Sequence, residues 1–216
     1  SQSEAYDALS EAQKKVISNA LRDFRLAGIG LPEADQKRYA ELQMKLSELT
    51  TKFSENVLDA TQGWNRLVTD PTELAGLPDH VLAAAKQAAA ADEKEGWLLT
   101  LDFPVYYAVM LQADNRALRE AFYTAYATRA SDQGVQNGEW DNSNLIDQIL
   151  TLRLELAQLL GFDHYADYSL ATKMAQSSDQ VVQFLQDLAA KSRPQAAQDL
   201  NELRTFANAH FGMESL

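Results

Sequence analysis

Apolar residues recur every three or four positions along most of this chain, which is the spacing of one buried face of an α-helix. The pattern is strongest between Asn142 and Ala175. Asn142 or Ser143 can cap the start of a helix there, and Gly161 follows the last apolar pair, where helices commonly stop. A second, short helix is expected after this glycine. The apolar face of the first helix consists of Leu145, Ile146, Ile149, Leu150, Leu152, Leu156, Leu159 and Leu160.

Further helices are predicted from the same spacing and from capping residues along the chain. We expect the last of them to be kinked or split at Pro194, because proline lacks an N–H and clashes with the preceding turn. The predicted helices span Glu4–Ala27, Glu33–Thr61, Pro71–Leu77, Pro78–Ala91, Pro104–Asp114, Asn115–Arg129 and Ser178–His210.

Two segments differ from this helical pattern and predict strands. Residues 64–69 place Trp64, Arg66 and Val68 on one side of an extended chain, and Trp97–Phe103 is a short apolar run. A lone ribbon of two strands is marginal in water, so we expect the two to pair antiparallel and to pack on helices. The predicted fold class is therefore all-α, mainly helical, with a small antiparallel β-ribbon.

The polar loop Ser131–Asp141 separates two helical stretches and contains two glycines and a single aliphatic residue, Val135. We predict that residues 1–216 form a single, mainly helical segment. If the chain divides, the subdomain boundary is expected near residues 131–142.

The composition and the net charge exclude several classes of expected partner. The net charge is −12, which repels phosphate, so neither nucleic acid nor an anionic membrane is an expected partner. No apolar run approaches the length of a membrane span. The chain contains no cysteine, which fits a reducing, cytoplasmic setting and leaves no thiol nucleophile.

The candidate residues for acid–base chemistry or metal binding are the three histidines, His80, His164 and His210. His164 and Asp167 lie one helical turn apart, and such a pair can act as a base or bind a metal. Zinc needs further ligands at suitable spacing, and the sequence offers none, so a surface or capping role for His164 is favoured. We therefore predict no catalytic, cofactor-binding or metal-binding residue in this chain.

The aromatic residues between 106 and 126 allow two interpretations. They can line a peptide-binding cleft, or they can fill the core, and aromatic residues at helical spacing are more often core. The set consists of Tyr106, Tyr107, Phe122, Tyr123 and Tyr126.

Several long blocks of the sequence resemble the thimet oligopeptidase family of zinc metallopeptidases. They read LRDFRLAGIGLPEADQKRYAELQMKLSELTTKFSENVLDAT, then LREAFYTAYATRASDQG, then LRLELAQLLGFDHYADYSLATKMA, in that order along the chain. The resemblance implies a helical molecule divided by a deep channel that admits short peptides to a zinc ion. That family binds zinc through His-Glu-x-x-His and a further glutamate, and no histidine here is followed by this pattern.

The resemblance therefore implies an N-terminal-to-middle, non-catalytic portion of a zinc metalloendopeptidase that hydrolyses short peptides. Zinc is expected in the parent enzyme and not in this segment, which should be inactive in isolation. Its expected partners are short peptides, through the parent enzyme, and the remaining catalytic domain of the same chain. The alternative is a free-standing helical module for protein binding or oligomerisation, which the long apolar faces at Tyr39–Val57 and Leu145–Leu160 would serve.

Overall fold

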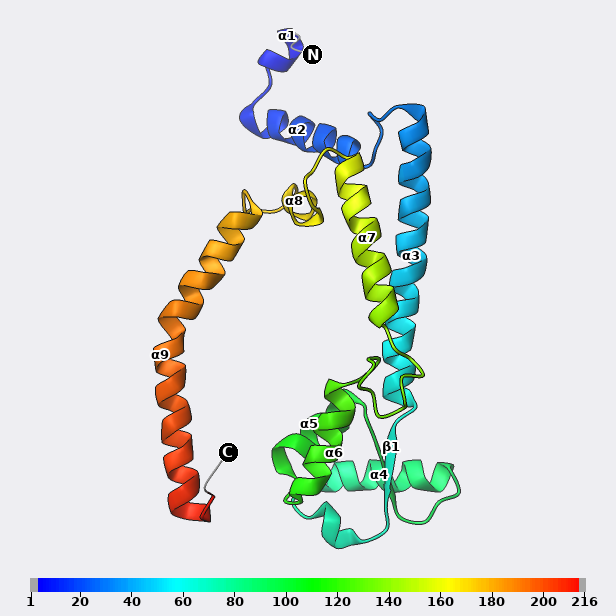
Figure 1. Cartoon of the computed structure of the whole chain (residues 1–216), viewed down its shortest axis with the longest axis vertical. Coiled ribbons are helices and arrows are strands. Elements are labelled where there is room, and N and C mark those ends of the chain that lie inside the picture. The colour runs from blue at the N-terminus through cyan, green and yellow to red at the C-terminus, as the bar shows by residue number, and fades with distance from the viewer. Residues whose placement is uncertain (1–3, 214–216) are drawn as a thin grey trace. The chain divides into compact units, whose positions relative to one another are not determined.

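The computed structural model describes residues 4–213, and Figure 1 shows their helices and strands. These residues are mainly helical and include one two-stranded antiparallel sheet, which confirms the predicted fold class. Residues 33–153 form one compact unit, whereas the chain up to Pro32 and from Leu154 onward belongs to another. The boundary expected near residues 131–142 stays a prediction.

The long helix α3, Glu33–Gln62, begins and ends within a residue of its predicted bounds. Its apolar stripe is buried as expected of a core-facing helix, with Leu42 fully inaccessible to solvent. Helix α7, Ser143–Leu159, lies beside α3 (Figure 1), and Phe53 of α3 and Ile149 of α7 line a common groove between them. The buried members of α3 are Leu42, Leu46, Leu49, Asn56 and Ala60.

The start of α7 differs from the prediction in one detail. We expected Asn142 or Ser143 to supply the capping oxygen, but Asp141 supplies it. The Oδ1 of Asp141 accepts hydrogen bonds from the backbone N–H of Ser143 at 2.9 Å and from its hydroxyl at 2.7 Å. The side chain of Asn142 is buried and has other partners, so it is not available to cap the helix.

The predicted ribbon is present and its strands are shorter than expected. Strand β1, Asn65–Val68, pairs antiparallel with β2, Trp97–Thr100, so that Arg66 lies opposite Leu99. Strand β2 ends early because α5, Phe103–Gln112, begins there with Pro104 in its first turn. The ribbon packs against α4, Asp79–Ala91, and against α5, as a marginal two-stranded sheet requires.

One apolar cluster joins the ribbon to the helices of this unit. It includes residues of the 3₁₀ helix η1, Pro71–Leu74, which is shorter than the predicted helix 71–77, and of α6, Arg116–Ala127. Helix α6 is capped as predicted by Asn115, whose side chain accepts the Leu118 N–H at 3.1 Å. The cluster consists of Val68, Leu74, Leu77, Val81, Ala85, Leu99, Leu101, Ala108, Val109, Ala113, Leu118, Phe122 and Ala125.

The single helix predicted for Glu4–Ala27 is wrong, because two helices occupy this stretch. Helix α1 covers Glu4–Asp7 and α2 covers Glu11–Leu26. Ser10 starts α2 with a capping box, in which its hydroxyl accepts the Gln13 N–H and the Gln13 side chain accepts the Ser10 N–H. This reciprocal pair satisfies two backbone N–H groups that a continuous helix would bond internally, so the chain restarts there.

The end of α7 and the two following helices agree with the sequence. Gly161 has a positive φ of 82° and stops α7, and the short helix α8 follows at Tyr165–Leu170. Helix α9 covers Ser178–Phe211, starts at a Ser177 cap and ends at Gly212. The helix continues across Pro194 without being split, and it bends along its length in Figure 1, so the predicted kink is the better of the two alternatives.

Candidate functional site

The three histidines lie at the ends of three different helices. His80 lies exposed in the first turn of α4, and His210 stacks on Phe206 in the last turn of α9, with ring centroids 4.1 Å apart. His164 is the N-cap of α8: its Nδ1 lies 3.4 Å from the Asp167 N–H and 3.3 Å from the Asp167 carboxylate. The capping role that the sequence favoured for His164 is thus confirmed.

The part of the chain that the structure describes contains no group of side chains placed to bind a metal ion together. No three His, Asp or Glu side chains of residues 4–213 gather closely enough to hold a metal ion. Four-coordinate zinc takes three or four protein ligands, so the donors present here do not fit that ion. The prediction that the chain holds no catalytic or metal-binding residue stays a prediction.

The aromatic set divides between core and surface. Phe122 is fully buried and packs against Trp64 in a T-shaped arrangement, with the ring centroids 4.8 Å apart. Tyr106 stacks on Tyr126, with the ring centroids 3.9 Å apart. Tyr107 and Tyr123 are instead more than half exposed. The core interpretation therefore holds for Phe122, Tyr106 and Tyr126 only.

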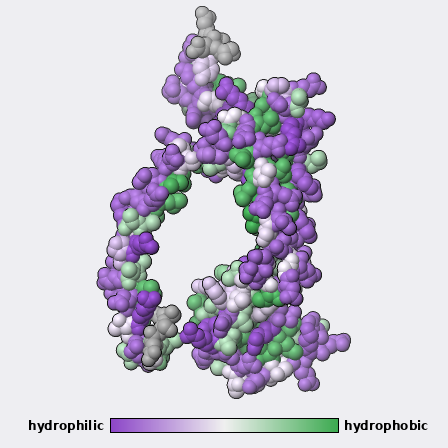
Figure 2. Space-filling view, in the orientation of Figure 1, coloured by the Kyte–Doolittle hydropathy of each residue, from purple (hydrophilic) through white to green (hydrophobic). Residues whose placement is uncertain are grey.

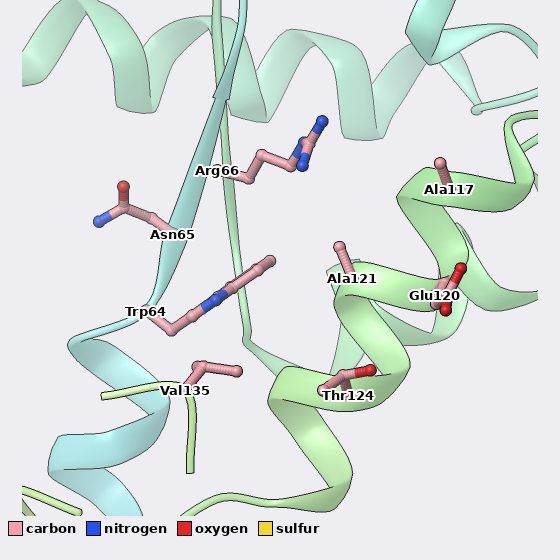
Figure 3. Close-up of a pocket in the computed structure, with 8 residues that line it drawn as sticks. All are labelled: Trp64, Asn65, Arg66, Ala117, Glu120, Ala121, Thr124 and Val135. Carbon is pink, nitrogen blue, oxygen red and sulfur yellow. The ribbon is translucent and has the colours of Figure 1, made fainter. Parts of the chain in front are cut away.

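One hollow of the unit formed by residues 33–153 lies between β1 and α6 (Figure 3). It is an open pocket of about 510 Å³. In Figure 3, Trp64 and Arg66 point from the strand toward α6, whereas Asn65 points the opposite way. The helix wall is formed mainly by small side chains, and the whole lining is Trp64, Asn65, Arg66, Ala117, Glu120, Ala121, Thr124 and Val135.

The chemistry of this pocket suits binding rather than bond cleavage. It contains one carboxylate, Glu120, and no histidine, so it lacks the nucleophile–base or acid–base pair that hydrolysis requires. Its guanidinium, Arg66, already pairs with Glu73 at 3.2 Å. The aromatic ring of Trp64 and the small residues of α6 leave a surface that can accept an apolar or amide-bearing group.

The sequence analysis did not predict this pocket, although the alternation of residues in the predicted strand indicates one of its two walls. The alternation of the predicted strand already places Trp64 and Arg66 on one side. Ala117, Ala121 and Thr124 lie at helical spacing and are too small to produce an apolar stripe that a pattern search would single out. Only the packing of α6 opposite β1 brings the two sets together.

Two carboxylates with displaced titration, Asp70 and Asp141, both serve local structure. Backbone and side-chain hydrogen bonds from Thr72 lower the pKa of Asp70, which caps η1. The Ser143 hydroxyl, and then the Ser143 backbone N–H, lower the pKa of Asp141. Both shifts come from cap hydrogen bonds that favour the charged form. Neither carboxylate is therefore a candidate acid or base.

The described residues thus form a helical scaffold with a small ribbon. The model of peptidase family M3 matches residues 109–216, and the chain belongs to this family of metallopeptidases. The chain is 59% identical over 211 residues to oligopeptidase A of Salmonella typhimurium and, likewise at 59%, to that of Escherichia coli. It is also 42% identical over 209 residues to the probable cytosolic oligopeptidase A of Arabidopsis thaliana.

These similarities extend over almost the whole chain but over a minor part of each relative. The match to the two bacterial enzymes covers 98% of this chain and 31% of the relative, and the plant match covers 94% and 29%. The chain therefore corresponds to a segment of an oligopeptidase A, as the sequence analysis expected, and spans less than a third of the length of these curated relatives.

Proposed function

We propose that this chain is the N-terminal-to-middle, non-catalytic portion of a zinc-dependent endopeptidase that hydrolyses short peptides, and that it is inactive in isolation. The observation that carries this proposal is the 59% identity over 98% of the chain and only 31% of oligopeptidase A. The sequence adds that none of its three histidines stands in a His-Glu-x-x-His motif.

The role proposed for the segment is that of a scaffold. Its apolar cluster holds the ribbon together with helices α4, α5 and α6, and its pocket beside β1 is a surface on which an extended peptide could lie. In the parent enzyme, zinc would polarise the scissile carbonyl and help to activate water. The ligands of that zinc would be outside these residues, and this chain would contribute shape and binding surface.

The setting we propose is the cytoplasm, with short peptides and the remainder of the parent protein as partners. Absence of cysteine and the bacterial relatives support it. Among residues 4–213, no helix combines the length and the apolar character needed to cross a membrane.

Replacing the corresponding segment of Escherichia coli oligopeptidase A by this chain tests the proposal. The 59% identity over 211 residues makes such a chimera feasible. We expect the chimera to hydrolyse quenched fluorescent peptides of a few residues and to lose this activity to a zinc chelator. The matched control is the same chimera with the glutamate of the recipient's His-Glu-x-x-His motif changed to glutamine, which should be inactive.

The isolated chain provides the complementary measurement. Supplied with zinc, it should show no turnover of the same peptides. Chelator-sensitive hydrolysis by the isolated chain, or a folded chimera without activity, would contradict the proposal. A folded but inactive chimera would favour the alternative, a free-standing helical module, which the exposed apolar residues of α2 and α9 otherwise suggest.

A further inference from the structure

Helix α9 is a 34-residue helix in which Ala207 is the one residue assigned as buried, so nearly all of its surface faces solvent. Several of its large apolar side chains are about half exposed: Leu185 by 54%, Leu188 by 51% and Leu203 by 60%. Isolated helices gain most of their stability from packing an apolar face. A helix of this length with an uncovered apolar face is therefore an incomplete structure that needs a partner.

These apolar residues are arranged on one side of the helix. We call this side the α9 stripe, and it comprises Val181, Leu185, Leu188, Leu200, Leu203 and Ala207. Ser192 and Ala196 continue it through the middle of the helix, where only small side chains stand on this side. These small side chains in the middle of the stripe leave room for another element to approach the helix closely.

The bend of α9 places the stripe on its concave side. Pro194 is nine residues from Leu185 and nine from Leu203, which is about 2.5 helical turns, so the proline lies opposite both leucines. A proline ring clashes with the carbonyl one turn earlier and opens the helix on its own side. The proline side is therefore convex and the α9 stripe concave, and in Figure 2 hydrophobic side chains lie on the inner curve in the upper part of the helix.

This curvature indicates what kind of body covers the stripe. Long helices in globular proteins curve around a core, with the convex side toward solvent. Two other occupants fit less well. A second copy of α9 in a coiled coil would need steps of three and four residues in alternation, but the steps from Val181 to Ala207 are 4, 3, 4, 4, 4, 3 and 4. A membrane surface would favour a basic polar face, whereas α9 has four acidic residues and three Lys or Arg.

We propose that the α9 stripe packs against the part of the parent peptidase that lies outside these 216 residues, and that it is a main docking surface between this segment and the catalytic portion. The inference rests on the proposed function, because only a parent protein of the relatives' length supplies such a body. The chain spans 31% of oligopeptidase A, so most of that length is available to form it.

The test uses the chimera with Escherichia coli oligopeptidase A and a double variant, Leu185→Gln with Leu203→Gln. Burying two amides in an apolar interface is unfavourable, so the thermal midpoint of the chimera should fall by about 5 °C or more. The matched control is Ala197→Gln, which adds the same amide toward the convex side of α9 and should shift the midpoint by about 1 °C or less.

Measurements on the isolated chain distinguish docking of the α9 stripe on the catalytic portion from packing of the stripe within this chain. There the double variant should leave the thermal midpoint unchanged, because the partner is absent, and should reduce the binding of a dye specific for exposed apolar surface. An equal loss of stability in the isolated chain would assign the stripe to an intrachain contact and overturn the proposal. So would a dimer of the unmodified chain in sedimentation that the double variant dissociates.

The two proposals can fail separately. If the unmodified chimera is folded and inactive, the proposed function fails, while its midpoint still reports whether the α9 stripe is buried. If the chimera is active and the double variant behaves like Ala197→Gln, the docking surface is wrong and the proposed function stands.

Discussion

The side-chain amides of Asn56 and Asn142, 86 positions apart in sequence, are hydrogen-bonded in the interior of the unit formed by residues 33–153. The Nδ2 of Asn56 donates to the Oδ1 of Asn142 at 2.9 Å, and the Nδ2 of Asn142 donates to the Phe53 carbonyl at 3.1 Å. Both asparagines are buried, by 93% or more of their surface, as the exposures of 7% and 2% imply. The pair therefore fixes the start of α7 against the C-terminal third of α3 through directional contacts that apolar packing alone would not provide.

Removing one partner of this pair should be costly. Asn142→Ala leaves the Asn56 amide buried without its acceptor, and such an orphaned group costs about 1–3 kcal/mol. We expect the free energy of unfolding, measured in denaturant, to fall by that amount. Asn144→Ala, on the exposed side of α7, is the matched control and should stay within about 0.5 kcal/mol. Equal effects of the two changes would mean that the buried pair adds no stability.

Adjacent aromatic residues of α6 should respond very differently to truncation. Phe122 is fully buried against Trp64, so Phe122→Ala creates a cavity and should cost about 3–5 kcal/mol of unfolding free energy. Tyr123 is 58% exposed, and Tyr123→Ala should cost less than about 1 kcal/mol in the isolated chain. Chemical denaturation of both variants checks the order, which the core interpretation requires.

Helix α7 offers the same comparison with one residue type. Leu156 is 2% exposed and Leu150 is 56% exposed, although both belong to the apolar pattern of the sequence. Leu156→Ala should destabilise the chain by about 2–5 kcal/mol because it leaves a cavity. Leu150→Ala should have an effect below about 1 kcal/mol. Similar melting curves for the two variants would show that the buried face of α7 has been placed on the wrong side.

The cap of α7 should make stability depend on acid pH. The pKa of Asp141 is lowered from 3.8 in the folded chain, so its contribution is complete above that pH and is lost as the pH falls through the folded pKa. Asp141→Asn keeps a capping oxygen without the titration. The stability difference between the natural chain and this variant should therefore shrink on acidification below 3.8.

A titration of the same carboxyl by NMR provides the control for this prediction. Ser143→Ala removes the hydroxyl that contributes most to the shift, and the pKa of Asp141 should rise toward 3.8. A carboxyl that titrates identically in both proteins would mean that the Ser143 hydroxyl does not stabilise its charged form.

The helices and the ribbon could largely be predicted, because their signals are local. The Asn115 cap, the Gly161 stop and the Ser177 cap each act within a few residues of themselves. The break between α1 and α2 also had a local signal, since Ser10 and Gln13 stand at capping-box spacing. The apolar pattern is continuous on both sides of Ser10 and predicts one helix, but the capping box at Ser10 starts a second one.

The pocket and the buried side chains could not be predicted in the same way. Tyr106 and Tyr107 are neighbours in α5, and both belong to one aromatic set, yet only Tyr106 stacks on Tyr126. Which face of α5 is covered depends on where α6 and the ribbon pack. That information is not present in the spacing of aromatic residues along the chain.

The mainly helical class, the antiparallel ribbon and the likeness to a peptidase family follow from the sequence alone, because periodicity, caps and long matching blocks are properties of neighbouring residues. Tertiary structure brings Asn56 to Asn142 and places Trp64 and Ala121 at a common pocket, and it leaves the leucines of the α9 stripe about half exposed. Each of these depends on segments far apart in the chain, and burial is a property of the space between them.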